Sequence, residues 1–256
     1  MGNLLRMDLY RMRKGKAFWV CLILTLVTAL AYTPLGRLIV FLASLISEEA
    51  GSMPATKNLS EIISDPFPML NAMLIMLSAC SFFYADVENG YIKNIAGQMP
   101  KKGYTILSKF LAIIPHNLLF MLVGVIGNLL GTVLFQKIVA DAAVADSIRI
   151  FALKLLLLQA ICAILLLVTS SLRSKSLGMV LAVLFGMGLL WLVYMGIDAG
   201  LAKLLPKLKF SLSDYMPDQL LREASPKTLR AVLVSAVTVG VFLPLSIRVF
   251  DKKDVK

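Results

Sequence analysis

This 256-residue sequence contains few of the residues that build metal sites and disulfide-bonded domains. It has one histidine and three cysteines, and only 16% of its residues are charged. Cys21, Cys80 and Cys162 show no paired spacing, and all three fall within long apolar stretches. The sequence therefore indicates neither a disulfide framework nor a metal site.

The motifs of nucleotide hydrolysis and of common hydrolases are also absent. No G-x-x-x-x-G-K-[ST] phosphate loop occurs, so the chain cannot use ATP by itself. H-E-x-x-H and G-x-S-x-G are missing, and a single histidine argues against zinc or triad chemistry. We expect that this chain is not an enzyme and holds no cofactor of its own.

Long hydrophobic runs are what the sequence does contain. Hydrophobic residues make up 59% of it and the mean hydropathy is +0.83, values outside the range of soluble domains. A charge-free stretch of about 17 residues or more can cross the hydrocarbon core as a helix. The sequence predicts an all-α membrane protein with one domain, residues 1–256, and six transmembrane helices at about 17–36, 66–85, 110–136, 155–172, 176–197 and 231–247.

The distribution of lysine and arginine predicts the orientation of these helices. The two termini and the second and fourth connectors hold 15 of the 26 basic residues within about 55 residues. The other three connectors hold 11 basic residues within about 80 residues. Because cytoplasmic loops carry the excess of positive charge, we expect both termini to be cytoplasmic. The same rule explains most of the net charge of +11, so nucleic-acid binding is not indicated.

Residues 1–16 predict an amphipathic helix before the first transmembrane helix. Leu5, Leu9 and Met12 share one face, whereas Arg6 and Arg13 fall on others. Such a helix lies in the membrane interface, with its apolar side among acyl chains and its cations near anionic headgroups. The alternative is a simple positively charged stop before the first transmembrane helix.

A short polar insert separates the second and third predicted transmembrane helices. In "FFYADVENG" the acidic pair Asp86 and Glu88 marks the emergence of the chain into water, and Gly90 permits a sharp bend. The next residues can form about two helical turns, on which Ile92 and Ile95 share a face. A helix this short needs a surface to pack against. That surface is either the chain's own helix ends or the groove of another protein.

The sequence of this insert resembles a known family. "ENGYIKN" followed by "PKKGYTILSKF" is similar to the cytoplasmic loop of bacterial type-2 ATP-binding cassette (ABC) transporter permeases. The match is carried by Glu88, Gly90, Ile92 and Lys93, with Lys101, Lys102 and Lys109 as the basic flank. The resemblance covers the whole chain in architecture and about twenty residues in detail.

The resemblance implies that residues 91–103 form a coupling helix in a cleft of a cytoplasmic ATPase subunit. It also implies two ATPase copies that bind ATP and Mg, a second permease copy, and a bacterial cytoplasmic membrane location. The residues that would couple to the ATPase are Glu88, Gly90, Tyr91, Ile92, Lys93, Asn94 and Ile95. The alternative is an ordinary interfacial loop with lysines that reach toward water.

The resemblance also implies a substrate pathway between two copies, lined mainly by the second and fifth transmembrane helices. The polar or amphipathic residues expected near it are Asn71, Ser78, Ser81, Trp191 and Tyr194. Helix packing is the alternative role for each of them. By the same analogy, residues 198–230 form an extracellular re-entrant or interfacial segment. The expected cargo is amphipathic or hydrophobic, such as antimicrobial or toxin-like peptides, drugs or lipids.

Small residues at four-residue spacing predict close helix packing in two of the transmembrane helices. They are Gly124, Gly127 and Gly131 in the third, and Gly178, Ala182 and Gly186 in the fifth. The only histidine, His116, follows Pro115 in the third. We expect a hydrogen-bonded structural histidine beside a proline kink, because a proton relay needs a partner and this helix contains no carboxylate.

Two other functions remain open from the sequence alone. An ion-gradient-driven secondary transporter would need midplane carboxylates or broken helices in inverted repeats, and the acidic residues lie only at the ends of the predicted helices. A non-transporting membrane scaffold subunit is the second alternative. An ATPase that purifies with the chain would distinguish the exporter from both.

Overall fold

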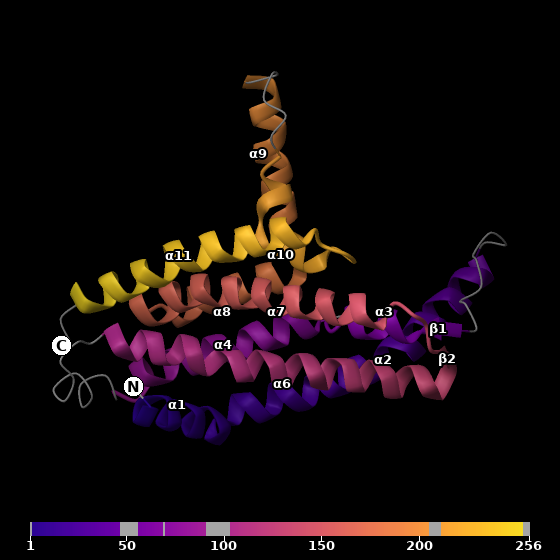
Figure 1. The fold of residues 1–256 in the computed structure, drawn as a ribbon, viewed down its shortest axis with the longest axis horizontal. Helices are drawn as coiled ribbons and strands as arrows, with labels where there is room; N and C mark the ends of the chain where they lie inside the picture. Colours follow the sequence, from indigo (N-terminus) through magenta and orange to yellow (C-terminus); the bar gives the residue numbers. More distant parts are fainter. Residues whose placement is uncertain (1, 47–55, 69, 91–102, 205–210, 253–256) are drawn as a thin grey trace.

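The computed structural model describes residues 2–46, 56–68, 70–90, 103–204 and 211–252, and shows a bundle of long helices with one helix that projects from its side (Figure 1). The predicted helical class is confirmed. The elements are α1 (Gly2–Lys14), α2 (Lys16–Ile46), β1 (Thr56–Asn58), α3 (Leu59–Ser64), α4 (Asn71–Glu88), α6 (Gly103–Phe135), β2 (Lys137–Val139), α7 (Val144–Leu166), the π-helical turn η1 (Leu167–Ser171), α8 (Lys175–Met187), α9 (Leu190–Leu204), the 3-10 turn η2 (Ser213–Tyr215), α10 (Pro217–Arg222) and α11 (Thr228–Lys252). The sequence did not predict the two short strands, which pair in parallel with Lys57 opposite Ile138.

Among the described residues, four helices are long and apolar enough to cross a membrane: α2, α6, α7 continued by η1, and α11. Helices α8 and α9 together make a fifth candidate that is bent by 78°. Helix α4 is not among them, because Asn71 and the acidic residues Asp86 and Glu88 lower the hydropathy of its 18 residues. It nevertheless lies inside the bundle, packed against α2 and α8.

Several helices are longer than the hydropathy of the sequence predicts. Helix α2 continues beyond residue 36, and α6 and α7 begin before the predicted starts at 110 and 155. The predicted segments contain no charged residue, so the first stops before Arg37 and the third and fourth start after Lys109 and Lys154. In the structure these three charged residues lie inside the helices. Hydropathy therefore located the four helices α2, α6, α7 and α11 but underestimated their lengths.

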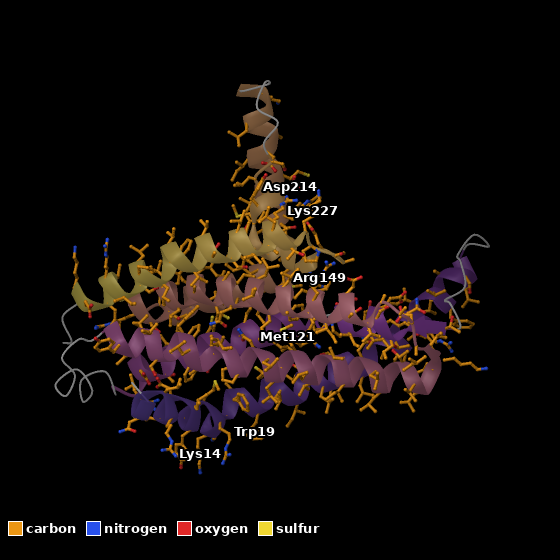
Figure 2. The ribbon with its side chains drawn as sticks, in the orientation of Figure 1. Lys14, Trp19, Met121, Arg149, Asp214 and Lys227 are labelled. Atoms are coloured by element: carbon orange, nitrogen blue, oxygen red, sulfur yellow. The ribbon has the colours of Figure 1, made fainter. Side chains whose placement is uncertain are left out.

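The apolar core forms where α4, α6 and α7 meet. Phe83, Phe120, Met121, Leu157 and Ile161 are fully buried there, and Met121 lies in the interior of the bundle (Figure 2). The outward faces of α2, α6 and α11 expose large apolar side chains instead. Such a surface suits contact with lipid rather than water.

The predicted fifth transmembrane helix, residues 176–197, is broken in the structure. Gly188 has φ +72°, in the left-handed region that favours glycine, and it ends α8. Helix α9 then leaves the bundle sideways (Figure 1). Arg222 of α10 donates to the carbonyl oxygens of Phe185 and Gly186 in the last turn of α8. The Phe185 carbonyl also accepts from the Gly188 N–H, whereas Arg222 supplies a partner for the Gly186 carbonyl at the helix end, and so stabilises the break.

Candidate functional site

Two of the predicted coupling residues, Glu88 and Gly90, lie at the end of the bundle that also holds α1, called here the α1 end. The other predicted coupling residues, Tyr91, Ile92, Lys93, Asn94 and Ile95, fall outside the described residues. Helix α4 ends at Glu88, Gly90 follows with φ +66°, and α6 begins at Gly103. A Cβ added to Gly103 would lie 2.5 Å from Ile247 of α11. Both flanks of the segment 91–102 are thus joined to the helical bundle.

Glu88 already has a partner within the chain. Its carboxylate binds the ammonium group of Lys175 at 2.9 and 3.0 Å, which connects the end of α4 with the start of α8. The Lys175 nitrogen also lies 5.6 Å from the ring centroid of Tyr84. Since both charged groups are partly exposed, such a pair contributes about 1 kcal/mol or less.

Asp86 is the centre of a buried ionic cluster at the α1 end. The sequence predicted its emergence into water, but the residue is only 6% exposed, because Arg11 of α1 and Lys109 of α6 bind its carboxylate. The Lys109 nitrogen lies 3.2 Å from Asp86 Oδ2 and donates to the Phe83 carbonyl at 2.6 Å. Ser170 of η1 donates to the same carbonyl at 2.8 Å. The cluster therefore joins α1, α4, α6 and η1.

Helix α1 adds a second buried carboxylate to this cluster. Asp8 is 3% exposed and accepts a hydrogen bond from Ser108 of α6. Burial raises the pKa of Asp8 above its ordinary value, and the Ser108 hydrogen bond opposes that shift. The buried face of α1 is Leu4, Asp8 and Met12. Of the predicted apolar face, Met12 is buried against the bundle and Leu5 and Leu9 are partly buried, so the lipid contact of this face stays a prediction.

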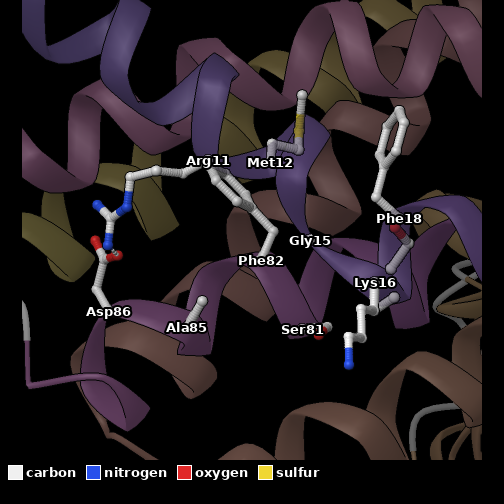
Figure 3. A pocket seen from close by; sticks show the side chains of 11 residues that line it. Arg11, Met12, Gly15, Lys16, Phe18, Ser81, Phe82, Ala85 and Asp86 are labelled. Carbon is white, nitrogen blue, oxygen red and sulfur yellow. Dashed lines mark ion pairs between the residues drawn. The ribbon is translucent and has the colours of Figure 1, made fainter.

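A small cavity of about 100 Å³ lies beside the cluster, between α4 and the junction of α1 with α2 (Figure 3). Arg11 and Asp86 face one another at one side of it, and Lys16 and Ser81 lie at another. Ser78 also lines it, so the cavity brings together two of the five residues predicted for a substrate pathway. Its lining combines charges and hydroxyls with aromatic rings.

A buried polar chain runs from Ser78 across α4, α6 and α7. The Ser78 hydroxyl lies 3.0 Å from His116 Nε2, and His116 Nδ1 lies 3.1 Å from Asn117 Oδ1. The Asn117 amide donates to Gln159 Oε1 at 3.2 Å, and Gln159 donates to the Phe110 carbonyl at 2.9 Å. His116 is therefore hydrogen-bonded through both ring nitrogens, and helix α6 continues through Pro115.

The other three predicted pathway residues lie elsewhere. Asn71 is buried at the start of α4 and accepts a hydrogen bond from Thr28 at 2.6 Å. Trp191 and Tyr194 lie on α9, beyond the helix break. Trp191 is 49% exposed, and the Tyr194 hydroxyl donates to Asp218 of α10 at 3.2 Å. The described part of one chain does not gather the five residues around a single path.

The small residues predicted for helix packing lie at close helix contacts. In α6, a Cβ added to Gly124, Gly127 or Gly131 would meet the Pro66 carbonyl, Ala29 or the Leu30 carbonyl. In α8, a Cβ added to Gly178 would meet Thr169 and one added to Gly186 would meet the backbone of Met73, while Ala182 is fully buried. Gly127 and Gly131 allow α2 to approach α6, Gly124 allows the chain before α4 to approach α6, and Gly186 allows α4 to approach α8.

No group of three or more histidine, cysteine, aspartate or glutamate side chains that could hold a metal ion is present in the described part of the chain. The charged groups of the buried cluster, Asp8, Arg11, Asp86 and Lys109, are paired with each other. A scan of protein-family models and a search of curated proteins found no match to this chain.

Proposed function

We propose that this chain is the membrane-spanning permease subunit of an ATP-driven ABC exporter in a bacterial cytoplasmic membrane. In this proposal two permease chains, identical or paralogous, act with two copies of a cytoplasmic ATPase subunit that binds ATP and Mg. The cargo class is amphipathic or hydrophobic: peptides of the antimicrobial or toxin-like kind, drugs or lipids. Two features support the proposal: the sequence of the insert resembles that of type-2 ABC permeases, and buried ion pairs connect the helices at the α1 end.

The observation that carries the proposal is the buried Asp86 cluster next to the insert. Arg11, Asp86 and Lys109 hold α1, α4 and α6 together at the point where the segment 91–102 joins the bundle. A force applied to that segment would reach three helices together, because separating them would expose unpaired charges. This is the mechanical property that a coupling segment between an ATPase and a permease requires.

The proposed topology has six transmembrane helices, with α4 as the second and both termini in the cytoplasm. Helix α4 is buried between helices that are long enough to cross a membrane, so it shares their direction through the bundle. Asp8 contacts Ser108 and Ile247 lies against Gly103, which places α1 and the last turns of α11 at the same end. The basic residues concentrated at this end favour the cytoplasmic side.

The proposed mechanism starts with closure of the ATPase pair. Closure shifts the coupling residues 91–97 as a lever, and the α1 end moves with them. The pathway between the two permease copies then opens outward. Ser78 and Ser81 are its proposed polar contacts on α4, and Trp191 and Tyr194 are those on α9.

The buried chain from Ser78 through His116 and Asn117 to Gln159 favours a second candidate, an ion-gradient-driven transporter. A buried histidine within the membrane is a feature of proton relays, although such relays also contain carboxylates, which this buried polar chain lacks. The broken helix α8–α9 is also a feature of secondary transporters. Ion-driven transport without any ATPase would establish this alternative.

The proposed coupling role can be tested with the variant Ile92→Asp. A carboxylate in an apolar docking groove would remain without a partner, so stimulation of ATP hydrolysis by the permease should be lost. Glu88→Gln should weaken the stimulation less, because the apolar anchor remains. The measurement is ATPase activity of the reconstituted complex, with membrane insertion checked in parallel. Unchanged ATPase stimulation in Ile92→Asp would exclude residues 91–97 as the coupling helix.

A further inference from the structure

A second cavity, of about 120 Å³, lies between the chain that precedes α4, the middle of α7 and the short helix α10. Its lining combines two cations, one carboxylate and three apolar side chains. The residues are Asp65, Phe67, Ala72, Lys154, Leu221 and Arg222. None of them belongs to the site at the α1 end.

Lys154 is the reason to expect a ligand here. The residue is only 3% exposed and it lines the cavity, and no hydrogen bond or ion pair joins its ammonium group to another described residue. The ammonium nitrogen is not among the fully buried atoms that lack partners, so it remains accessible to a ligand. An anion there would form a charge-assisted hydrogen bond with it. Asp65 lines the same cavity and attracts Lys154 without forming an ion pair within 4.0 Å.

Arg222 adds a second cation whose position is fixed. Its guanidinium donates to the carbonyl oxygens of Phe185 and Gly186, which holds it against the end of α8. A guanidinium has five N–H donors, so these two bonds leave others for a ligand. Among the residues that line the cavity, Lys154 and Arg222 together exceed the single charge of Asp65, while Asp218, which attracts Arg222, lies outside the lining.

The position of the cavity indicates which anion is available to it. Helix α10 ends at Arg222 and contacts α11, a candidate transmembrane helix that begins at Thr228. The first turns of α11 expose Leu229 and Leu233, which suits contact with acyl chains. The cavity thus lies near exposed apolar side chains of a candidate transmembrane helix, where a phospholipid could reach it.

We propose that this cavity binds the phosphate group of an anionic phospholipid, with Lys154 and Arg222 as the cations that contact it. Charge-assisted hydrogen bonds between these cations and phosphate oxygens would supply the partner that Lys154 lacks. Asp65 would weaken the binding through its negative charge. This site does not depend on ATP-driven export, and it would be present in a transporter of either class.

Native mass spectrometry of the purified chain in detergent with phosphatidylglycerol tests the proposal. We expect Lys154→Met to bind phosphatidylglycerol about fivefold more weakly, the usual effect of one cation at a membrane surface. Lys137→Met is the matched control, because Lys137 lies in β2 on the surface and outside the cavity. It should bind as the wild type does. Equal phosphatidylglycerol binding by Lys154→Met and wild type would overturn the proposal.

Asp65→Asn provides a test in the opposite direction. Removal of the only carboxylate in the cavity should strengthen phosphatidylglycerol binding by about fivefold for the same electrostatic reason. Misfolding of the variant would weaken phosphatidylglycerol binding, so it cannot explain tighter binding. Weaker or unchanged binding by Asp65→Asn would contradict the proposed role of charge.

Two further binding experiments distinguish a lipid phosphate from free phosphate. Phosphatidylcholine, whose choline group adds a positive charge, should be bound more weakly than phosphatidylglycerol by the wild type. Millimolar inorganic phosphate should not displace phosphatidylglycerol, because it cannot replace the acyl-chain contacts. Displacement by inorganic phosphate would show a site for the free anion and would overturn the lipid proposal.

Discussion

Lys109 of α6 places its ammonium nitrogen 3.2 Å from a carboxylate oxygen of Asp86 on α4, and both residues are almost fully buried. Removal of one partner leaves the other charge buried without compensation. We expect Asp86→Asn to lower the free energy of unfolding by about 3 kcal/mol. The measurement is unfolding in mild detergent by titration with sodium dodecyl sulfate.

Two variants serve as controls for this prediction. Glu88→Gln disrupts the partly exposed pair with Lys175 and should cost about 1 kcal/mol or less. Adding Lys109→Met to Asp86→Asn removes the uncompensated ammonium group and should recover part of the lost stability. A double variant less stable than Asp86→Asn would show that the ion pair does not explain the effect.

Gly131 is a position where a methyl group should prevent close helix contact. A Cβ there would meet the Leu30 carbonyl of α2, and backbone cannot move aside cheaply. We expect Gly131→Ala to destabilise the protein by about 1–3 kcal/mol. Gly240→Ala is the control, because no atom lies within 4 Å of an added Cβ there. Equal stability of the two variants would contradict the assigned α2–α6 contact.

His116 offers a spectroscopic test, since it is the only histidine in the chain. The Asn117 amide nitrogen donates to Gln159, so Asn117 Oδ1 is left to accept from His116 Nδ1. In the neutral imidazole, Nε2 then accepts from Ser78. Nitrogen-15 NMR at neutral pH should show a protonated Nδ1 and an unprotonated Nε2. Two protonated ring nitrogens would contradict this assignment and favour the ion-driven transporter.

Asp218 of α10 predicts a pH dependence of stability. Burial raises the pKa of its carboxyl above 3.8, so the folded protein favours the protonated form. The protonated Asp218 carboxyl contributes its full stability below the pKa of the unfolded state. That contribution is lost as the pH rises through the pKa of the folded state. Asp218→Asn should therefore gain stability over the wild type as pH rises from about 4.

Thermal unfolding midpoints at pH 4 and pH 8 measure this difference. Asp146→Asn is the control, because its side chain is 70% exposed and lies on the surface of α7. That variant should follow the wild type across the range. A constant difference between Asp218→Asn and wild type at both pH values would show that the Asp218 carboxyl does not titrate as proposed.

Hydropathy predicted where the four long helices lie. A helix that crosses lipid needs one unbroken run of apolar residues, because charged groups and unpaired backbone are costly there, and such a run is visible in the sequence. Hydropathy underestimated the helix lengths wherever a charged residue such as Lys109 is paired inside the fold. The break at Gly188 was missed, since no proline marks it. The glycines in "FGMGLL" were the only local signal, and one of them, Gly186, was interpreted only as a packing residue.

The ionic cluster could not be predicted from the sequence, because its members come from distant segments. Asp8, Arg11 and Ser170 have no local pattern that marks them as partners of Asp86, Lys109 or Ser108. The coupling insert was predicted from Glu88, Gly90 and Ile92, which are close in sequence, and its role stays a prediction. The contacts of the neighbouring cluster depend on tertiary structure, which short-range sequence signals do not reveal.

Co-purification tests the central claim of an ATP-driven exporter most directly. The chain would be expressed with its genomic neighbours, purified in mild detergent and examined by mass spectrometry for stoichiometric partners. We expect an ATPase subunit at one copy per permease chain, and its loss from the Ile92→Asp variant. A stable, folded permease that never retains an ATPase would exclude an ATP-driven exporter.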